Sequence, residues 1–172
     1  MKDLQADNIG ELWDIYDINK QRTGRNHLRG QRLANGDYHL VANAIIFNDE
    51  KQILIQQRSF KKLSRPGQWT AESGGSVLQN ETSQHAIVRE LREELNLVVD
   101  IAQLGMLTTR YYFDWIEDWY AVHVNIKLDD LTIQQSEVER IRWATLEEVL
   151  TIASSNGIDE AVLYKQAYDL LF

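Results

Sequence analysis

Three glutamates, Glu90, Glu93 and Glu94, lie within five residues near the middle of residues 75–97. On a helix, successive residues turn by about 100°, so the three side chains fall within an arc of roughly 100°. Carboxylates this close repel one another and raise each other's pKa unless a cation neutralises them. Carboxylate oxygens are hard ligands that suit Mg²⁺, with Mn²⁺ as the alternative. The pattern predicts a divalent-metal site, and a solvated acidic face is the competing interpretation.

The same stretch carries the apolar stripe that a helix needs in order to pack on a core. Ile87, Val88, Leu91 and Leu95 occupy the arc next to the glutamates. Asn96 follows them, and asparagine is the usual substitute for glycine in the left-handed residue that ends a helix. We therefore expect a helix with one face on the core and an acidic face beside it.

Eight residues of this stretch form a longer pattern, namely Gly75, Glu81, Arg89-Glu90-Leu91, Glu93-Glu94 and Leu97. This pattern resembles the Nudix box. A chance match to eight of its positions in a chain of this composition is on the order of one in a million. The resemblance implies an α/β fold, a Nudix-type α/β/α sandwich with a mixed β-sheet. It also implies hydrolysis of a nucleoside diphosphate linked to another moiety, by attack of water on a phosphorus of the pyrophosphate. Asn96 stands where the box has glycine.

The resemblance also implies a role for each box residue. Glu90 and Glu94 are the principal metal ligands it implies. Glu93 is a further ligand, directly or through water, and one of the candidate catalytic residues. Arg89 is expected to orient the carboxylates by paired hydrogen bonds, a task for which its planar guanidinium is suited. Glu81 is expected to orient Arg89 or to cap the structure rather than to bind metal.

The segment before the box contributes a glycine turn and four basic side chains. The resemblance implies that the Gly74 carbonyl is a backbone ligand, and a residue without a Cβ lets a loop approach a cation closely. Arg58, Lys61, Lys62 and Arg65 lie within eight positions of the chain just upstream. Basic groups beside a metal site are a candidate phosphate clamp, with a solvated loop as the alternative.

The general base is left open between a box glutamate and two candidates outside the helix. Glu117 is interpreted as part of an aromatic loop, between Trp115 and Trp119. Glu137 lies in residues 136–143, which resemble the segment before the last strand in many Nudix proteins. The two tryptophans are candidates for stacking on a base or ring, and core packing is the alternative.

Residues 40–69 resemble the branch of the family that includes isopentenyl-diphosphate isomerase. That isomerase uses a cysteine where this chain has Gly74, and this chain has no cysteine. His39 matches one histidine of the isomerase pattern, whereas Ser76 stands at another. We therefore expect a hydrolase of this branch. A catalytically inactive Nudix-fold module that binds a ligand is the alternative, and an isomerase is disfavoured.

Composition limits the partners. With 18 Lys and Arg against 26 Asp and Glu, the chain has a net charge of −8, which argues against duplex nucleic acid and anionic membranes. The first residues contain no apolar run long enough for a signal peptide or membrane span. The expected partner is a small-molecule pyrophosphate, the expected location is the cytoplasm, and a homodimer is left open.

The 172 residues are about the size of one domain. We expect an N-terminal extension, residues 1–30, packed on a single Nudix domain, residues 31–172. The first nine residues are expected to be frayed, residues 19–32 to form a loop or hairpin, and Thr145 with Glu148 to open a helix as a capping box. That helix is expected to end near Asn156 and Gly157, and Asp159 to open the last one. Strands are expected at residues 12–16, 39–47, 52–58, 98–109 and 119–127.

Overall fold

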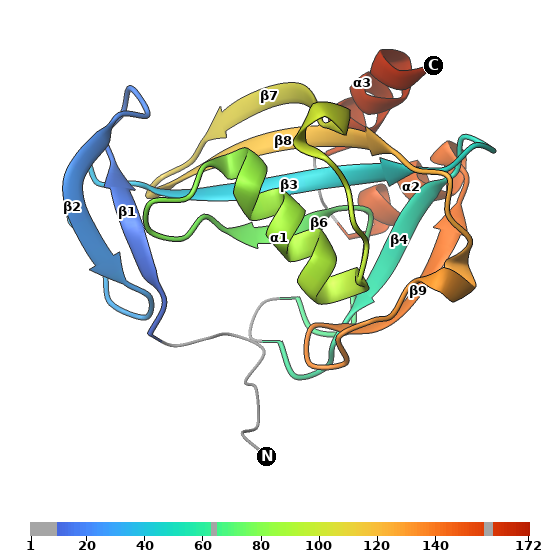
Figure 1. Cartoon of the computed structure of the whole chain (residues 1–172), viewed down its shortest axis with the longest axis horizontal. Coiled ribbons are helices and arrows are strands. Elements are labelled where there is room, and N and C mark those ends of the chain that lie inside the picture. Colours follow the sequence, from blue (N-terminus) through green and yellow to red (C-terminus); the bar gives the residue numbers. More distant parts are fainter. Residues whose placement is uncertain (1–9, 63–64, 157–159) are drawn as a thin grey trace.

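The structure is a computed structural model that describes residues 10–62, 65–156 and 160–172. Within them the chain forms a seven-stranded sheet, a separate two-stranded sheet and three α-helices (Figure 1). The small sheet is β1 (Leu12–Tyr16) with β2 (Arg22–Leu28). The large sheet consists of β3 (His39–Phe47), β4 (Ile53–Arg58), β5 (Trp69–Thr70), β6 (Ser73–Ser76), β7 (Gly105–Tyr111), β8 (Trp115–His123) and β9 (Val138–Ala144). The helices are α1 (Ser83–Leu95), α2 (Leu146–Ser155) and α3 (Ala161–Leu171), with short 3-10 turns η1 (Ile101–Gln103) and η2 (Leu128–Asp130).

The large sheet is mixed, as expected. Its strand order is β5-β4-β3-β8-β7, with β6 on β3 and β9 on β4. β3 runs parallel to β8 and antiparallel to β4 and β6. Helix α1 covers one face, whereas α2 and α3 cover the other (Figure 1). The predicted sandwich of helices around a mixed sheet is therefore confirmed.

Two hydrophobic cores hold these layers together. On one face, Ile87, Leu91 and Leu95 of α1 are fully buried against even-numbered residues of β3 such as Ala42. On the other face, α2 and α3 pack on the opposite side of the same strand, around Phe47. Because side chains alternate along a strand, β3 serves both cores. The apolar stripe predicted for the helix is thus the surface that fixes α1 on the sheet.

The predicted helix ends are confirmed where the structure describes them. Thr82 caps the start of α1 through a bond from the His85 amide, and Asn96 ends it with φ 54°, the expected left-handed residue. Thr145 and Glu148 form the predicted capping box of α2. Gly157, Asp159 and the first nine residues lie outside the described part of the chain.

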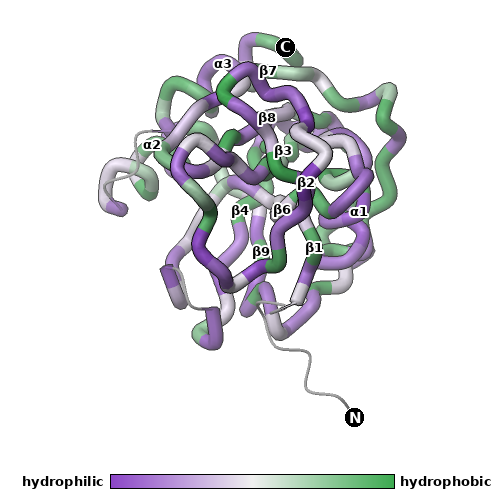
Figure 2. Tube along the Cα trace, turned by 90° about the vertical axis from the view of Figure 1, so that its left-hand side faces the viewer, coloured by the Kyte–Doolittle hydropathy of each residue, from purple (hydrophilic) through white to green (hydrophobic). Residues whose placement is uncertain are grey.

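The β1–β2 hairpin lies beside the start of the large sheet. The strand predicted at residues 12–16 is confirmed, and the polar segment after it contains β2, which is exposed and hydrophilic along most of its length (Figure 2). Backbone bonds between Tyr16 and Tyr38, 2.8 and 3.0 Å long, join the hairpin to the residue before β3. The hairpin is therefore held against the large sheet.

Two predicted strands have wrong bounds. The strand predicted at residues 98–109 begins only at Gly105, because Asp100 and Gln103 form a capping box around η1. The strand predicted at residues 119–127 is β8, Trp115–His123, which pairs with all nine residues of β3. Its apolar alternation is real, but the parallel partner sets its ends. Of the described helices, none is long and apolar enough to cross a membrane.

Candidate metal and substrate site

A cavity of about 540 Å³ lies between α1, the β6 segment, the β1–β2 hairpin and the loops that follow β4 and precede β9. Most of the residues that line it carry polar or charged side chains. Several site residues predicted from the sequence meet there, namely Arg58, Lys62, Gly74, Arg89, Glu90, Glu93, Glu94 and Glu137. The remaining lining residues are Glu11, Arg29, His39, Val41, Gly75, Ser76 and Gln134.

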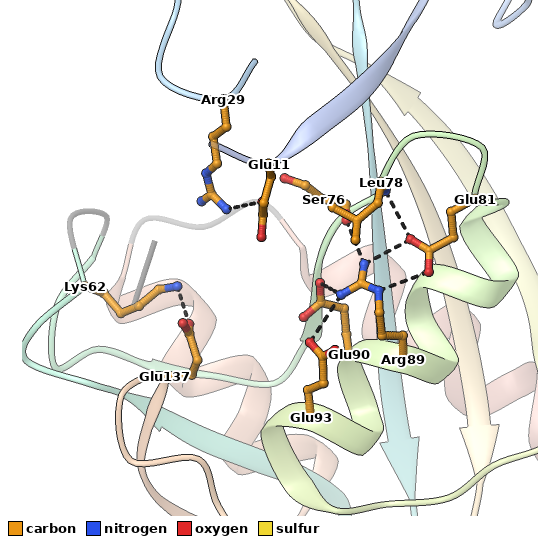
Figure 3. Close-up of polar contacts among 10 residues, drawn as sticks. All are labelled: Glu11, Arg29, Lys62, Ser76, Leu78, Glu81, Arg89, Glu90, Glu93 and Glu137. Carbon is orange, nitrogen blue, oxygen red and sulfur yellow. Dashed lines mark hydrogen bonds and ion pairs between the residues drawn. The ribbon is translucent and has the colours of Figure 1, made fainter. Parts of the chain in front are cut away.

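Arg89 holds two of the box glutamates in place (Figure 3). Its Nη1 donates to Glu90 Oε1 at 2.8 Å and to Glu93 Oε2 at 3.3 Å. Its Nη2 donates to the Ser76 carbonyl at 3.1 Å, which ties α1 to the end of β6. One guanidinium thus sets the positions of two carboxylates and of the strand beside them.

Glu81 in turn orients Arg89. Its two carboxylate oxygens accept from Arg89 Nε and Nη2, each at 3.0 Å. The carboxylate also accepts from the Leu78 amide at 3.0 Å, so the turn before the helix fixes it (Figure 3). A bidentate pair of this kind fixes direction as well as distance. Glu81 therefore acts as a positioning group, as the sequence indicated.

Glu94 is buried, with 7% of its surface exposed, and its Oε2 has no hydrogen-bond partner among the described residues. Burial, followed by the charges of Glu90 and Glu137, raises the pKa of Glu94 to about 8. Burial also raises the pKa of Glu90, against the opposing charge of Arg89. An unpartnered buried oxygen costs about 1–3 kcal/mol, a cost that a bound cation removes.

The glycine turn brings backbone close to these carboxylates. Gly74 has φ 155°, and a Cβ there would lie 2.0 Å from the Ala42 carbonyl oxygen. A Cβ on Gly75 would lie 2.5 Å from Glu90 Oε1. A side chain at Gly74 would meet backbone of β3, whereas one at Gly75 would displace the Glu90 carboxylate. The Gly74–Gly75 backbone lines the same cavity as the glutamates.

The donor set fits Mg²⁺. In the described residues, no three His, Asp or Glu side chains already converge as an assembled metal site, and Arg89 holds Glu90 and Glu93 instead. The oxygens that face the cavity are nevertheless the hard ligands that Mg²⁺ and Mn²⁺ prefer. The unpartnered oxygen of Glu94 is the specific observation that a cation would explain.

Only two of the four basic residues of the predicted phosphate clamp line the cavity. Arg58 and Lys62 line the cavity, and Lys62 forms an ion pair with Glu137 (Figure 3). Burial, followed by the charge of Arg65, lowers the pKa of Arg58. Lys61 is exposed and does not line the cavity, and Arg65 lies 3.5 Å from Glu72 instead.

Of the two candidate general bases outside the helix, only one lines the cavity. Glu137 precedes β9 and lines the cavity. Glu117 lies within β8, not in a loop, and accepts from the indole nitrogens of Trp115 at 3.0 Å and Trp119 at 2.8 Å. Trp119 is 1% exposed, and Trp115 is stacked on Tyr112 with ring centroids 4.5 Å apart. These three residues of β8 are not among those that line the cavity.

Sequence reasoning missed the contribution of the hairpin. Glu11, just before β1, and Arg29, just after β2, pair at 2.9 Å and reach the cavity from the open end of the hairpin (Figure 3). His39 lines it too, stacked 4.5 Å from Trp13, and burial lowers its pKa to about 4. No local pattern marks Glu11 or Arg29, whereas His39 had a signal only as a match to an isomerase histidine.

Comparison with known proteins agrees with this geometry. The profile of the NUDIX domain matches residues 37–165. An uncharacterized Nudix hydrolase of Listeria monocytogenes is 35% identical over 160 residues, which cover 93% of this chain and 95% of that protein. An isopentenyl-diphosphate Delta-isomerase of Salmonella arizonae is 29% identical over 67% of this chain and 66% of its own length. The crystal structure of a Deinococcus radiodurans protein superposes with a TM-score of 0.72 and 25% identity, covering 92% of this chain and 99% of that chain.

Proposed function

This chain belongs to the Nudix family, and we propose that it is a Mg²⁺-dependent hydrolase that cleaves the pyrophosphate of a nucleoside diphosphate linked to another moiety. The observation that carries the proposal is the buried Glu94 oxygen without a partner. It lies in a cavity that also holds Glu90 and the basic side chains of Arg58 and Lys62. Such a cavity combines cation ligands with groups that attract phosphate.

The box residues would hold the metal. Glu90, Glu94, Glu93 and the Gly74 carbonyl are the proposed ligands, and Mn²⁺ is the alternative ion. When bound, the metal supplies positive charge that offsets the charge that develops on the phosphate oxygens. Arg89 keeps the carboxylates in place by the hydrogen bonds described above, so that they need no rearrangement during the reaction.

Glu137 is the proposed general base, because it is the candidate outside the helix that lines the cavity. Its carboxylate forms an ion pair with Lys62 while the cavity holds no substrate. A phosphate group would compete for Lys62, and the freed carboxylate could then accept a proton from the attacking water. Arg58 would remain on the phosphate oxygens throughout.

The alternatives are an inactive ligand-binding module and an isomerase. The chain has no cysteine to serve as the acid or base of the isomerase reaction, so isopentenyl diphosphate should not yield dimethylallyl diphosphate. The intact set of box glutamates favours an enzyme over a binding module. A cytoplasmic location, a homodimer and the division at residue 30 stay predictions.

The test is a phosphate-release assay with a panel of nucleotide-linked diphosphates, with and without Mg²⁺. Glu94→Gln is the matched variant, since it keeps the shape of the side chain and removes the charge. We expect metal-dependent hydrolysis by the wild type and at least a tenfold loss of Mg²⁺ affinity in the variant, measured by calorimetry. Unchanged Mg²⁺ binding in Glu94→Gln would overturn the ligand assignment.

A further inference from the structure

The β1–β2 hairpin precedes the residues that the NUDIX profile matches, yet it contacts the turn that leads into α1. We infer that Asp14 in β1 is a positioning residue for Arg89, and through it for the carboxylates of the metal site. The kinetic part of this inference rests on the proposed function. The structural part rests on hydrogen bonds that can be followed residue by residue.

The hairpin forms hydrogen bonds to three successive residues of the turn before α1, namely Gln79, Asn80 and Glu81. The Gln79 amide donates to the Leu12 carbonyl at 2.8 Å. The Asn80 amide donates to Asp14 Oδ2, also at 2.8 Å. Asn80 has φ 65°, a left-handed conformation that costs free energy in a residue other than glycine unless its surroundings fix it. Asp14, a buried residue that is 8% exposed, supplies that fixing contact.

Arg22 in β2 makes the third contact between the hairpin and the turn. Its Nη2 donates to the Glu81 carbonyl, and its Nε lies 3.2 Å from Asp14 Oδ2. The same oxygen of Asp14 therefore holds both the Asn80 amide and the guanidinium that holds Glu81. A single carboxylate thus sets the position of the turn from two sides.

The position of the turn in turn fixes the carboxylates of the proposed metal site through Glu81 and Arg89. The carboxylate of Glu81 holds Arg89 by two bonds of 3.0 Å, and Arg89 holds Glu90 at 2.8 Å (Figure 3). A displacement of the turn moves Glu81, and Arg89 must follow because its Nε and Nη2 are both bonded to that carboxylate. Asp14 itself does not line the cavity. It should therefore affect metal affinity and turnover without contacting the substrate.

The test compares Asp14→Ala and Asp14→Asn with a matched control in the same hairpin region. Asp37 is also 8% exposed and also pairs with an arginine of β2, since Arg25 donates to it at 2.7 and 2.6 Å, but that pair does not touch the turn. The readouts are the Kd of Mn²⁺ without substrate, measured by calorimetry, and kcat and KM with a pyrophosphate substrate.

We expect Asp14→Ala to raise the Mn²⁺ Kd by about tenfold, as loss of an outer-shell contact does at other metal sites. It should lower kcat by about tenfold as well, because small displacements of catalytic groups are costly, while KM stays within about twofold. Asp14→Asn keeps an acceptor for the Asn80 amide and should recover most of both losses. Asp37→Ala should leave Kd and kcat at wild-type values.

Two results would overturn the inference: an Asp14→Ala variant with wild-type Mn²⁺ affinity and kcat, or an equal loss in Asp37→Ala. If Asp14→Ala does not fold, Arg22→Gln replaces it, since that side chain is 43% exposed and its loss still releases Glu81. Here too, wild-type Mn²⁺ affinity would overturn the inference. A wild type that hydrolyses nothing would refute the proposed function alone, because the Mn²⁺ series still tests Asp14. A wild type that binds no Mn²⁺ would refute both.

Discussion

Gly75→Ala should disable the site while leaving the fold intact. The added Cβ would lie 2.5 Å from Glu90 Oε1, whereas an ordinary contact begins at 3.4 Å, so the carboxylate must move by about 0.9 Å. Gly75 does not have a positive φ, so alanine adds no backbone strain there. The atoms that it meets are the end of a side chain, which can move at little cost in stability.

A move of this size breaks the 2.8 Å bond between Arg89 and Glu90. A displacement of about 1 Å at a catalytic group costs roughly 100-fold in rate, so kcat should fall by about that factor. The free energy of unfolding should change by less than about 1 kcal/mol. Steady-state kinetics, calorimetry with Mn²⁺ and thermal unfolding measure the three quantities.

Two other glycines provide the controls. A Cβ on Gly105 would lie 2.8 Å from Leu170 Cδ2, again the end of a side chain, but away from the cavity, so Gly105→Ala should keep wild-type kcat. Gly74→Ala would instead meet backbone of β3 and should unfold at a lower temperature. If Gly75→Ala retains kcat and Mn²⁺ affinity, the placement of Glu90 against the glycine turn is wrong.

Three further predictions follow from the site. Lys62→Ala should raise KM for a pyrophosphate substrate, and this effect should weaken at high salt. Lys61→Ala should leave KM unchanged, because Lys61 does not line the cavity. Equal effects of the two substitutions would contradict the assignment of Lys62 alone to the cavity. Glu137→Gln should lower kcat by about 100-fold or more at saturating metal, and an unchanged pH–rate profile would exclude it as the base. His39 stays neutral in the fold down to pH about 4, whereas the unfolded chain takes up a proton below its ordinary pKa of about 6.5. Stability should therefore fall by about 3 kcal/mol as the pH drops from 6.5 to 4, and urea unfolding of His39→Gln should show a smaller loss.

Local signals predicted the elements that are specified locally. The apolar stripe and Asn96 defined α1, and the Thr145–Glu148 capping box defined the start of α2. The bounds of β8 failed because its partner sets them: β3 pairs with it from His39 onward, so the strand begins at Trp115. Nothing in residues 115–118 alone reports that pairing.

The error at Glu117 has the same origin. A carboxylate between two tryptophans looked like part of an exposed aromatic loop. On a strand, however, Trp115, Glu117 and Trp119 point to one face, and both indoles donate to the carboxylate between them. A motif of alternating residues can therefore be a satisfied polar cluster on a strand, and only the strand assignment distinguishes it from a loop.

The site residues that sequence reasoning missed reach the cavity only through tertiary contacts. Glu11 and Arg29 lie far before the box in the sequence, and their presence in the cavity depends on how the hairpin docks against the turn at Gln79 and Asn80. Spacing within the box carries no information about such docking. The box therefore predicted the side of the cavity that is lined by glutamates, and the opposite wall required the structure.

The charges in the cavity also indicate where the missing interaction lies. Arg89 offsets Glu90 and Glu93, and Lys62 offsets Glu137, each through direct contacts. Glu94 is the box glutamate whose buried oxygen has no partner in the described chain, although its neighbours on the helix are paired. A buried carboxylate left in this state destabilises the fold unless something else satisfies it. The proposed cation would supply the missing interaction at this oxygen, and Glu94 is therefore the residue that most directly supports the metal proposal.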